Sequence, residues 1–499
     1  MTMVAFLSSV VASAQSPTTS INAAISLYPR STHPTIKPRV GLAKMRPVPL
    51  LVQDQPWEPR IDNGYPNIVV PSPSSSSWQL FYGDCVDTCS SQILLYANST
   101  DGLTWRKPHL GLFDVGRVRK DLKHIGKANN ILLQGGGVGV WRDPRTSTYI
   151  GFGPACYGNM SGDTCKLAAE PDGSFQLAGT VKDLAFSHDG LHWWGGRTIS
   201  WPAPQRYDCH NNLWFDAVEG RWVATTRDGF SSAPGRAVGM AETPSAVLAF
   251  NTSAAPQLTL SGSLSHQLYS QITFRWRNII LGIVMVYDAE DPAGRVRCRL
   301  SWARTALSDW QWVEGDEKSG PELLPLGPSG AFNSHICFAA NSPARWQDEE
   351  RLYFMGGNGP HNGERNSSLG LATMRRDGFA GVGGVGRLEL LPILITAELL
   401  TVTYDAPPDG GALRIGLADP SISIGLSLEH SIPLTTSGTD HVMSFTGGCG
   451  GPDFGAYVGS NATLAVELSG GAGGILYTVG FVPHGSDVIE RKCERNFYT

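Results

Sequence analysis

The sequence predicts an all-β protein, a five-bladed β-propeller followed by a β-sandwich. Three observations lead to this fold class. Charged residues make up only 17% of the 499 residues, while Gly (58) and Pro (33) are plentiful, as many tight turns require. A hairpin of two short strands recurs five times at nearly constant spacing. Beyond about Leu388 the repeat gives way to differently spaced strands between Gly, Pro and Asp turns.

Each repeat begins with a short apolar strand, a polar turn and an aromatic-rich strand, which together indicate a β-hairpin. A third strand is expected after each hairpin. We expect the five hairpins at 67–82, 138–152, 212–225, 272–287 and 336–355, and the third strands near Ile93, Asp183, Arg236, Val296 and Ser368.

Two third strands end in one phrase, with Ser, Asp, Gly and Trp at the same spacing. The phrase covers 99–105 in the first repeat and 187–193 in the second. In such a turn Asp accepts backbone N–H groups, Gly takes a positive φ, and Trp packs between blades. We therefore expect Asp101 and Asp189 to be structural.

The chain divides by composition. Apolar residues at 4–11 precede Ala12-Ser13-Ala14, the pattern of a signal peptide cleaved after Ala14, although a disordered apolar N-terminus would also fit because the start lacks Lys and Arg. Five glycosylation sequons, at Asn98, Asn159, Asn251, Asn366 and Asn461, favour export to the extracellular space. The expected parts are 1–14 signal peptide, 15–55 Ser/Thr/Pro-rich leader, 56–380 propeller, 386–485 sandwich and 486–499 tail.

Charge and cysteine content exclude several classes of protein. The net charge of −5 comes without a basic run, so neither nucleic acid nor an anionic membrane is an expected partner. After the N-terminus no apolar run is long enough to span a membrane. The nine cysteines lack a CxxC motif, which argues against a zinc cluster. Disulfides could join Cys85 to Cys89, Cys156 to Cys165 and Cys449 to Cys493.

Blade topology predicts which rim carries the chemistry. Residues that precede the first strand of a blade share a rim with residues that follow its second strand. That rim collects carboxylates, amides, His, Arg and Tyr, the groups that a sugar site needs, and glycosidic cleavage needs two carboxyl groups. Turn-making Asp and Asn are the structural alternative. The rim residues are Asp62, Asn129, Asn130, Asp208, His210, Gln267, Tyr269, Asn333, His335, Asp84, Asp87, Arg227, Asp228, Asp288, Glu290, Asp291, His361, Glu364 and Arg365.

The phrases that begin at Asp62 (62–68) and at Asp208 (208–216) resemble inner-strand openings of five-bladed glycoside hydrolases, the clan of families 32, 43, 62 and 68. The phrase at 96–112, followed by Asn129-Asn130-Ile131, resembles the branch described as family 32 N-terminal domain-like, whose members end in a β-sandwich. The resemblance implies that Asp62 is nucleophile or base and that Asp208 stabilises the transition state or tunes the acid. The general acid has no matching motif, so Glu290 and Glu364, both on the rim, are the candidates.

The sequence thus predicts a secreted glycoside hydrolase-like protein that cleaves an unidentified glycan with paired carboxylates. A non-catalytic carbohydrate-binding propeller and a protein-interaction propeller are the alternatives. No motif indicates a cofactor; an axial Ca²⁺ near His335 would fit the fold but is not indicated. The candidate catalytic residues are Asp62, Asp208, Glu290 and Glu364, and the candidate substrate-binding residues are Asn130, His210, Arg227, Asp228, Tyr269, His335 and His361.

Overall fold

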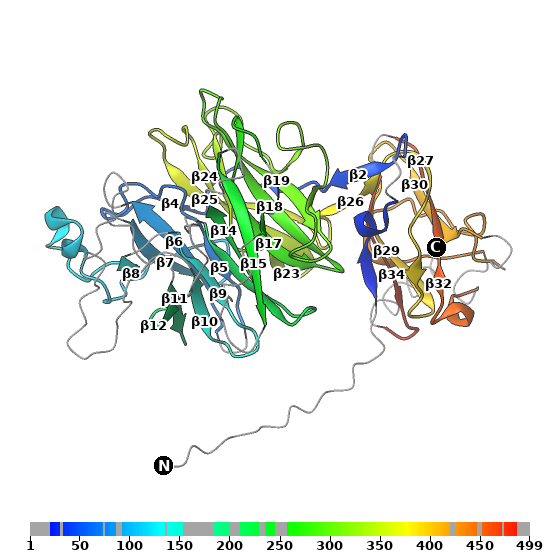
Figure 1. Cartoon of the computed structure of the whole chain (residues 1–499), viewed down its shortest axis with the longest axis horizontal. Coiled ribbons are helices and arrows are strands. Elements are labelled where there is room, and N and C mark those ends of the chain that lie inside the picture. Colours follow the sequence, from blue (N-terminus) through cyan, green and yellow to red (C-terminus); the bar gives the residue numbers. More distant parts are fainter. Residues whose placement is uncertain are drawn as a thin grey trace, which may run out of the picture. The chain divides into compact units, whose positions relative to one another are not determined.

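The computed structural model is nearly all β (Figure 1). Among the described residues the helices are four short 3₁₀ turns: η1 (Ala24–Leu27), η2 (Val115–Arg117), η3 (Lys120–Leu122) and η4 (Gly455–Tyr457). The structure describes residues 20–29, 33–72, 75–85, 92–134, 137–152, 183–198, 210–228, 235–244, 257–258, 260, 262–419, 425–446, 452–471 and 474–486. The expected signal peptide, Asp87, Asp208 and the expected cysteine partners from Cys89 onward lie outside these ranges.

The chain forms two compact units, one from residues 38–380 and one from residues 1–37 together with 381–499. Residues 38–380 form unit 2, which contains three four-stranded antiparallel sheets. In pairing order their strands are β5 (Asn67–Val69), β6 (Trp78–Cys85), β7 (Gln92–Ser99), β8 (Ile131–Gln134); β9 (Gly139–Arg142), β10 (Tyr149–Phe152), β11 (Asp183–Ser187), β12 (Trp193–Thr198); and β13 (Asn212–Asp216), β14 (Arg221–Asp228), β15 (Ala237–Pro244), β16 (Gln257–Leu258).

The fourth sheet of unit 2 has two antiparallel runs that meet at one parallel bridge, between Val296 and Ile336. The outer strands of the second run come from the N-terminal side of the chain, which the sequence did not predict. The first run is β17 (His266–Trp276), β18 (Ile279–Asp288), β19 (Val296–Ala303) with β20 (Gln311–Trp312) and β21 (Glu322–Leu324); the second is β22 (Ile336–Ala339), β24 (Glu349–Gly357), β25 (Ser367–Arg375), then β3 (Lys44–Met45) and β4 (Leu51–Val52), with β23 (Ala344–Trp346) on β24.

Asparagine side chains tie the first strands of these five antiparallel runs together. Asn67 on β5 accepts from the backbone N–H of Val140 on β9 at 2.9 Å. Asn212 on β13 accepts from the N–H of Thr273 on β17 at 3.1 Å and donates to the carbonyl of Asn341 at 3.0 Å. Asn341 follows β22 and in turn accepts from the backbone of β5 at 2.8 Å. The first strands therefore lie against one another, which brings their N-terminal ends to one region.

The Ser-x-Asp-Gly turns pack one run against another. Asp101 accepts from the N–H groups of Leu103 and Thr104, both at 2.7 Å, and the Thr104 hydrogen bond is the main reason its pKa falls to about 2. Arg351 and Tyr353 on β24 donate to the carbonyls of Asp101 and Gly102, at 2.6 and 2.9 Å. The turn of the first run thus packs on the last run, and the structural role expected for Asp101 is confirmed.

Replacing Gly102 with alanine should lower the free energy of unfolding by about 2–4 kcal/mol, because two costs add. Its φ is +73°, and an added Cβ would lie 2.5 Å from the Tyr353 hydroxyl. Gly111→Ala is the matched control, since its φ is +74° with nothing within 4 Å of the Cβ, and it should cost only about 1 kcal/mol. Urea unfolding of both variants measures the difference; equal losses would contradict the packing role of the turn.

A disulfide joins Cys298 on β19 to Cys337 on β22, at the point where the two antiparallel runs meet. This pair was not among those suggested by sequence spacing. Cys85 is also disulfide-bonded, and its suggested partner Cys89 lies outside the described residues.

Replacing both Cys298 and Cys337 with alanine should destabilise unit 2 by about 2–4 kcal/mol. The sequence separation of 39 residues makes the closed loop long, so its opening adds substantial entropy to the unfolded chain. Thermal unfolding of the double variant is the measurement. A melting temperature equal to that of the wild type would show that strand pairing alone holds β19 and β22 together.

The other unit has its own hydrophobic core, to which two sheets contribute. Residues 20–28, expected to belong to a leader, form β1 (Ile21–Ala23) and η1, and β1 pairs with β34. In pairing order, the first sheet contains β2 (Lys37–Val40), β26 (Ala380–Gly383), β34 (Ile475–Val482), β29 (Leu399–Asp405) and β31 (Gly438–Val442). The second sheet contains β27 (Gly386–Glu389), β33 (Leu464–Ser469) and β30 (Ala412–Leu417). In addition, β28 (Ile393–Leu394) pairs with β32 (Asn461–Ala462).

Candidate functional site

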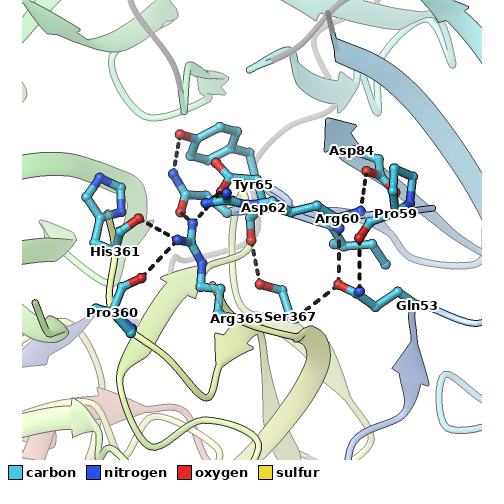
Figure 2. A network of polar contacts seen from close by, with 12 residues as sticks. Gln53, Pro59, Arg60, Asp62, Tyr65, Asp84, Pro360, His361, Arg365 and Ser367 are labelled. Carbon is cyan, nitrogen blue, oxygen red and sulfur yellow. Dashed lines mark hydrogen bonds and ion pairs between the residues drawn. The ribbon is translucent and has the colours of Figure 1, made fainter. Parts of the chain in front are cut away.

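The candidate site lies where the chain enters β5. Asp62 sits five residues before that strand, and the following Gly64 and Tyr65 both have positive φ, +64° and +41°, which makes a sharp turn. Ser367, at the start of β25, donates to the backbone carbonyl of Asp62 at 2.6 Å. A turn in the first run and a strand start in the last run therefore fix Asp62, as Figure 2 shows.

Two arginines hold the Asp62 carboxylate (Figure 2). Arg365 donates to Asp62 Oδ1 at 2.5 Å and to Asn63 Oδ1 at 2.7 Å, and Arg60 donates to Asp62 Oδ1 at 2.9 Å. The Arg365 side chain is 0% exposed, while that of Asp62 is 18% exposed. Every polar contact described for this carboxylate among the residues of known placement uses Oδ1, which leaves Oδ2 to a ligand.

A phenol and amide cluster lies beside Asp62. The Asn63 amide donates to the hydroxyls of Tyr65 and Tyr269, at 2.6 and 3.0 Å, and the two hydroxyls are 3.2 Å apart. Tyr269 packs edge-on against the ring of His361, with centroids 4.8 Å apart. Tyr65 packs on His210 at 5.1 Å. Tyr269, His210 and His361, all predicted substrate-binding residues, are therefore brought to the Asp62 region.

Both histidines are neutral near neutral pH. Burial lowers the pKa of His210 to about 3, and the Arg227 charge adds to the effect. Burial likewise lowers the pKa of His361 to about 3, and the charges of Arg365, Arg236, Arg227 and Arg60 act in the same direction. His210 Nδ1 lies 2.9 Å from the Ser270 hydroxyl. Too small a fraction of either ring is protonated near pH 7 for it to act as a general acid.

A buried carboxyl group, Asp84, lies behind the site. It is 2% exposed, and its Oδ1 accepts from the backbone N–H of Arg60 at 3.2 Å. Burial raises its pKa well above the usual range, and the negative charges of Glu58 and Asp62 add to the rise. Asp84 therefore holds the Arg60 backbone in place through a hydrogen bond, and because it is buried it cannot contact a substrate.

Asn130 lies fully buried beneath this region, with its amide committed to protein groups. Its Nδ2 donates to Tyr82 Oη at 3.0 Å and to the Tyr96 carbonyl at 2.7 Å, and its Oδ1 accepts from Trp57 Nε1 at 2.8 Å. Tyr82 also donates to Glu58 at 2.6 Å. The predicted substrate-binding amide is thus 0% exposed and part of the support of the site.

The two candidate general acids lie on neighbouring loops. Glu290 and Glu364 are both exposed, and within the described ranges neither side chain makes a hydrogen bond or an ion pair. The loops are joined, because the His361 N–H donates to the Gly294 carbonyl at 3.0 Å. Glu364 directly precedes Arg365, so the Arg365–Asp62 contact also anchors the Glu364 backbone near the site.

The remaining predicted residues are placed as follows. Arg227 lies at the end of β14, with its guanidinium 4.1 Å from the centroid of the Tyr269 ring. Asp228 is the last residue of β14, its side chain outside the described part of the structure, as is all of Asp208. His335 is half-buried, its Nδ1 2.8 Å from the Ser334 hydroxyl, and burial lowers its pKa.

Four contributors to this site were not predicted: Arg60, Asn63, Tyr65 and Arg236. Three of them, Arg60, Asn63 and Tyr65, flank Asp62 in the sequence. They could have been predicted from their closeness to Asp62. Arg236 precedes β15, and its guanidinium lies over the Tyr269 and Tyr287 rings at 5.5 and 5.1 Å. Neither its position nor its neighbours in sequence distinguish Arg236 from an ordinary strand start.

A cavity of about 530 Å³ lies at the opposite ends of the inner strands, near the hairpin turns. Its arginines are all ion-paired, Arg277 with Asp377, Arg345 with Glu350 and Arg275 with Asp216. Its charge is therefore balanced within the protein, so we place the candidate site at the Asp62 end. The other lining residues include Trp141, Trp214, Phe215, Phe274, Trp276 and Phe379.

Neither a cluster of metal ligands nor a membrane-spanning helix occurs in the described part of the chain. There, no three His, Cys, Asp or Glu side chains gather closely enough to hold a metal ion. Over the same residues, no helix has the length and apolarity to cross a membrane.

Comparison with known proteins gave similar structures only. No family model matches the chain, and no curated protein matches it in sequence. A GH62 hydrolase in complex with xylotriose superposes with a TM-score of 0.42 at 10% identity, covering 67% of this chain and 97% of that one. A thermostable family-43 glycoside hydrolase gives 0.41 at 10% identity, covering 67% and 96%.

An exo-β-1,3-galactanase from Phanerochaete chrysosporium with galactose superposes over a longer stretch, covering 87% of this chain and 100% of that one, with a TM-score of 0.38 at 8% identity. The likeness is distant in all three cases, so the functional argument rests on the residues of the Asp62 site.

Proposed function

We propose that the protein is a glycoside hydrolase that cleaves glycosidic bonds with paired carboxylates at the Asp62 site. The observation that carries the proposal is the Asp62 carboxylate itself. It is partly exposed, it is fixed through Oδ1 by Arg60 and Arg365, and its Oδ2 is left for a ligand. A carboxylate fixed this firmly beside phenol and imidazole rings suits a nucleophile or a base that must meet one sugar carbon.

The fold that we propose for this role is a five-bladed propeller with a C-terminal β-sandwich. Five antiparallel runs whose first strands contact one another support the propeller, as does the packing of the first Ser-x-Asp-Gly turn on the last run. Two sheets that share one core support the sandwich. We further propose that the protein is exported, as its N-terminus and its sequons suggest.

Glu364 is our first choice of general acid, with Glu290 the alternative and Asp208 the carboxylate that tunes the acid. Glu364 directly precedes Arg365, whose ion pair with Asp62 keeps the Glu364 backbone near the site. The separation of the acting carboxyl groups would set the stereochemistry, about 5–5.5 Å for retention and about 6.5–9.5 Å for inversion.

A non-catalytic glycan-binding protein is the second candidate. The observation in its favour is that Glu290 and Glu364 are both exposed and make no polar side-chain contact with the described residues. Among the described residues, none holds either candidate acid in place.

Hydrolysis of a panel of aryl glycosides and polysaccharides tests the proposal. Asp62→Asn keeps an oxygen for Arg365 but removes the charge, so turnover should fall by about 100-fold or more when it is measured well below the melting temperature of the variant. Loss of the counter-charge to buried Arg365 should also lower that melting temperature. Asp101→Asn, a change of the same chemistry in a structural turn, should keep its activity. Turnover by Asp62→Asn equal to wild type would overturn the assignment. Glycan binding without any turnover would favour the second candidate.

A further inference from the structure

Four described arginines gather at the Asp62 carboxylate and at the adjoining Tyr269 ring. Arg60 and Arg365 both ion-pair with this one carboxylate. Arg227 and Arg236 reach the same region from the two ends of the β14–β15 connection.

Arg236 is the guanidinium best placed to meet a ligand. It is half-buried, with its charge over the Tyr269 and Tyr287 rings, and its Nη1 donates to the Gln267 amide oxygen at 2.7 Å. That partner is neutral, and within the described part of the chain Arg236 has no ion pair. The cation–π contacts with the two rings restrain the side chain and leave donors of the guanidinium for an anion.

His361 lies within reach of the same four arginine charges. The ring is 9% exposed, and its Nδ1 has no hydrogen-bond partner among the described atoms. Beyond burial, the charges of all four arginines hold it neutral, with a pKa of about 3. The four arginines therefore act on the ring that packs against Tyr269.

We propose that this site selects acidic saccharides, sugars that carry a carboxylate or a sulfate ester, and that Arg236 binds the anionic group. The inference rests on the proposed carbohydrate site and names its substrate class. An arginine fork matches the paired oxygens of either anion, and stacking on Tyr269 reduces the entropy lost on binding. The half-buried position strengthens the interaction relative to bulk water.

Equilibrium binding of matched polysaccharides tests the proposal without requiring turnover. Each uronate-containing polysaccharide is compared with its own carboxyl-reduced form, and each sulfated one with its desulfated form. We expect at least one acidic parent to bind about tenfold or more tightly than its neutral form, with affinity that falls as salt rises. The two pairs also tell a carboxylate ligand from a sulfate ligand.

Arg236→Gln should remove this preference while keeping the hydrogen-bonding reach of the side chain. Arg142→Gln is the matched control, because Arg142 also stacks on a tyrosine, Tyr149, at 5.7 Å, but on another sheet. Neutral forms that bind as tightly as their acidic parents, an unchanged preference in Arg236→Gln, or no binding of any acidic saccharide would each overturn the inference. Acid-selective binding without hydrolysis would support the acidic-saccharide inference and contradict the hydrolase proposal. Hydrolysis of neutral glycans alone would support the hydrolase proposal and contradict the acidic-saccharide inference.

Discussion

Arg365→Met will lower the free energy of unfolding of unit 2 by about 3–5 kcal/mol. The guanidinium is fully buried and donates to four oxygens, those of Asp62, Asn63 and the carbonyls of Pro360 and His361. Methionine fills much of the volume but donates nothing, so buried acceptors lose their partner and Asp62 keeps only Arg60. Removing one partner of a buried ion pair costs more than a surface pair because the remaining charge is poorly solvated.

Two further variants separate charge from geometry. Arg365→Lys keeps the charge but cannot donate to four oxygens at once, so it should recover only part of the loss. Arg106→Met, at an exposed position of the same unit, should stay within about 0.5 kcal/mol of wild type. Urea unfolding measures all three. If Arg365→Met were as stable as Arg106→Met, the ion pair between Arg365 and Asp62 would not contribute to the stability of unit 2.

The sequence predicted individual hairpins well because their signals are local. Short apolar and aromatic-rich segments alternate with polar turns along the chain, and strands occur at all five expected hairpins. The outer strands β3 and β4 escaped prediction because each is two residues long and pairs with β25, more than 300 positions away. Nothing in a two-residue strand distinguishes it from a loop.

The site shows the same division between local and distant signals. Blade topology placed Asp62 and Arg365 on the same rim, but nothing in the sequence pairs these two side chains, which lie 303 residues apart. Asn130 has the residue type of a sugar ligand, but its burial under Trp57 depends on tertiary packing. Residue type identifies which groups can do the chemistry, and only the fold decides which of them reach a ligand.

The second large loss of stability is expected from the buried ion pair between Lys107 and Glu58. Lys107→Met should destabilise unit 2 by about 3–5 kcal/mol at pH 8, because it leaves the buried Glu58 carboxyl without its charged partner. The Lys107 ammonium lies 2.5 Å from Glu58 and 2.7 Å from Asp54, and the Glu58 side chain is 0% exposed. Glu58→Gln in the same chain should restore most of the loss, since the amide oxygen can still accept from Tyr82.

The loss should also depend on pH. Burial already raises the pKa of Glu58, and the Lys107 charge and hydrogen bond oppose that rise. Without Lys107 the folded-state pKa rises further above the unfolded value, so the folded variant holds a proton that the unfolded chain has released. Its stability therefore falls as pH rises through that interval. Urea unfolding at pH 5 and pH 8 should show the smaller loss at pH 5, and the double variant should remove the dependence. An equal loss at both pH values would mean that lost packing of the lysine, rather than the unpaired Glu58 charge, destabilises the protein.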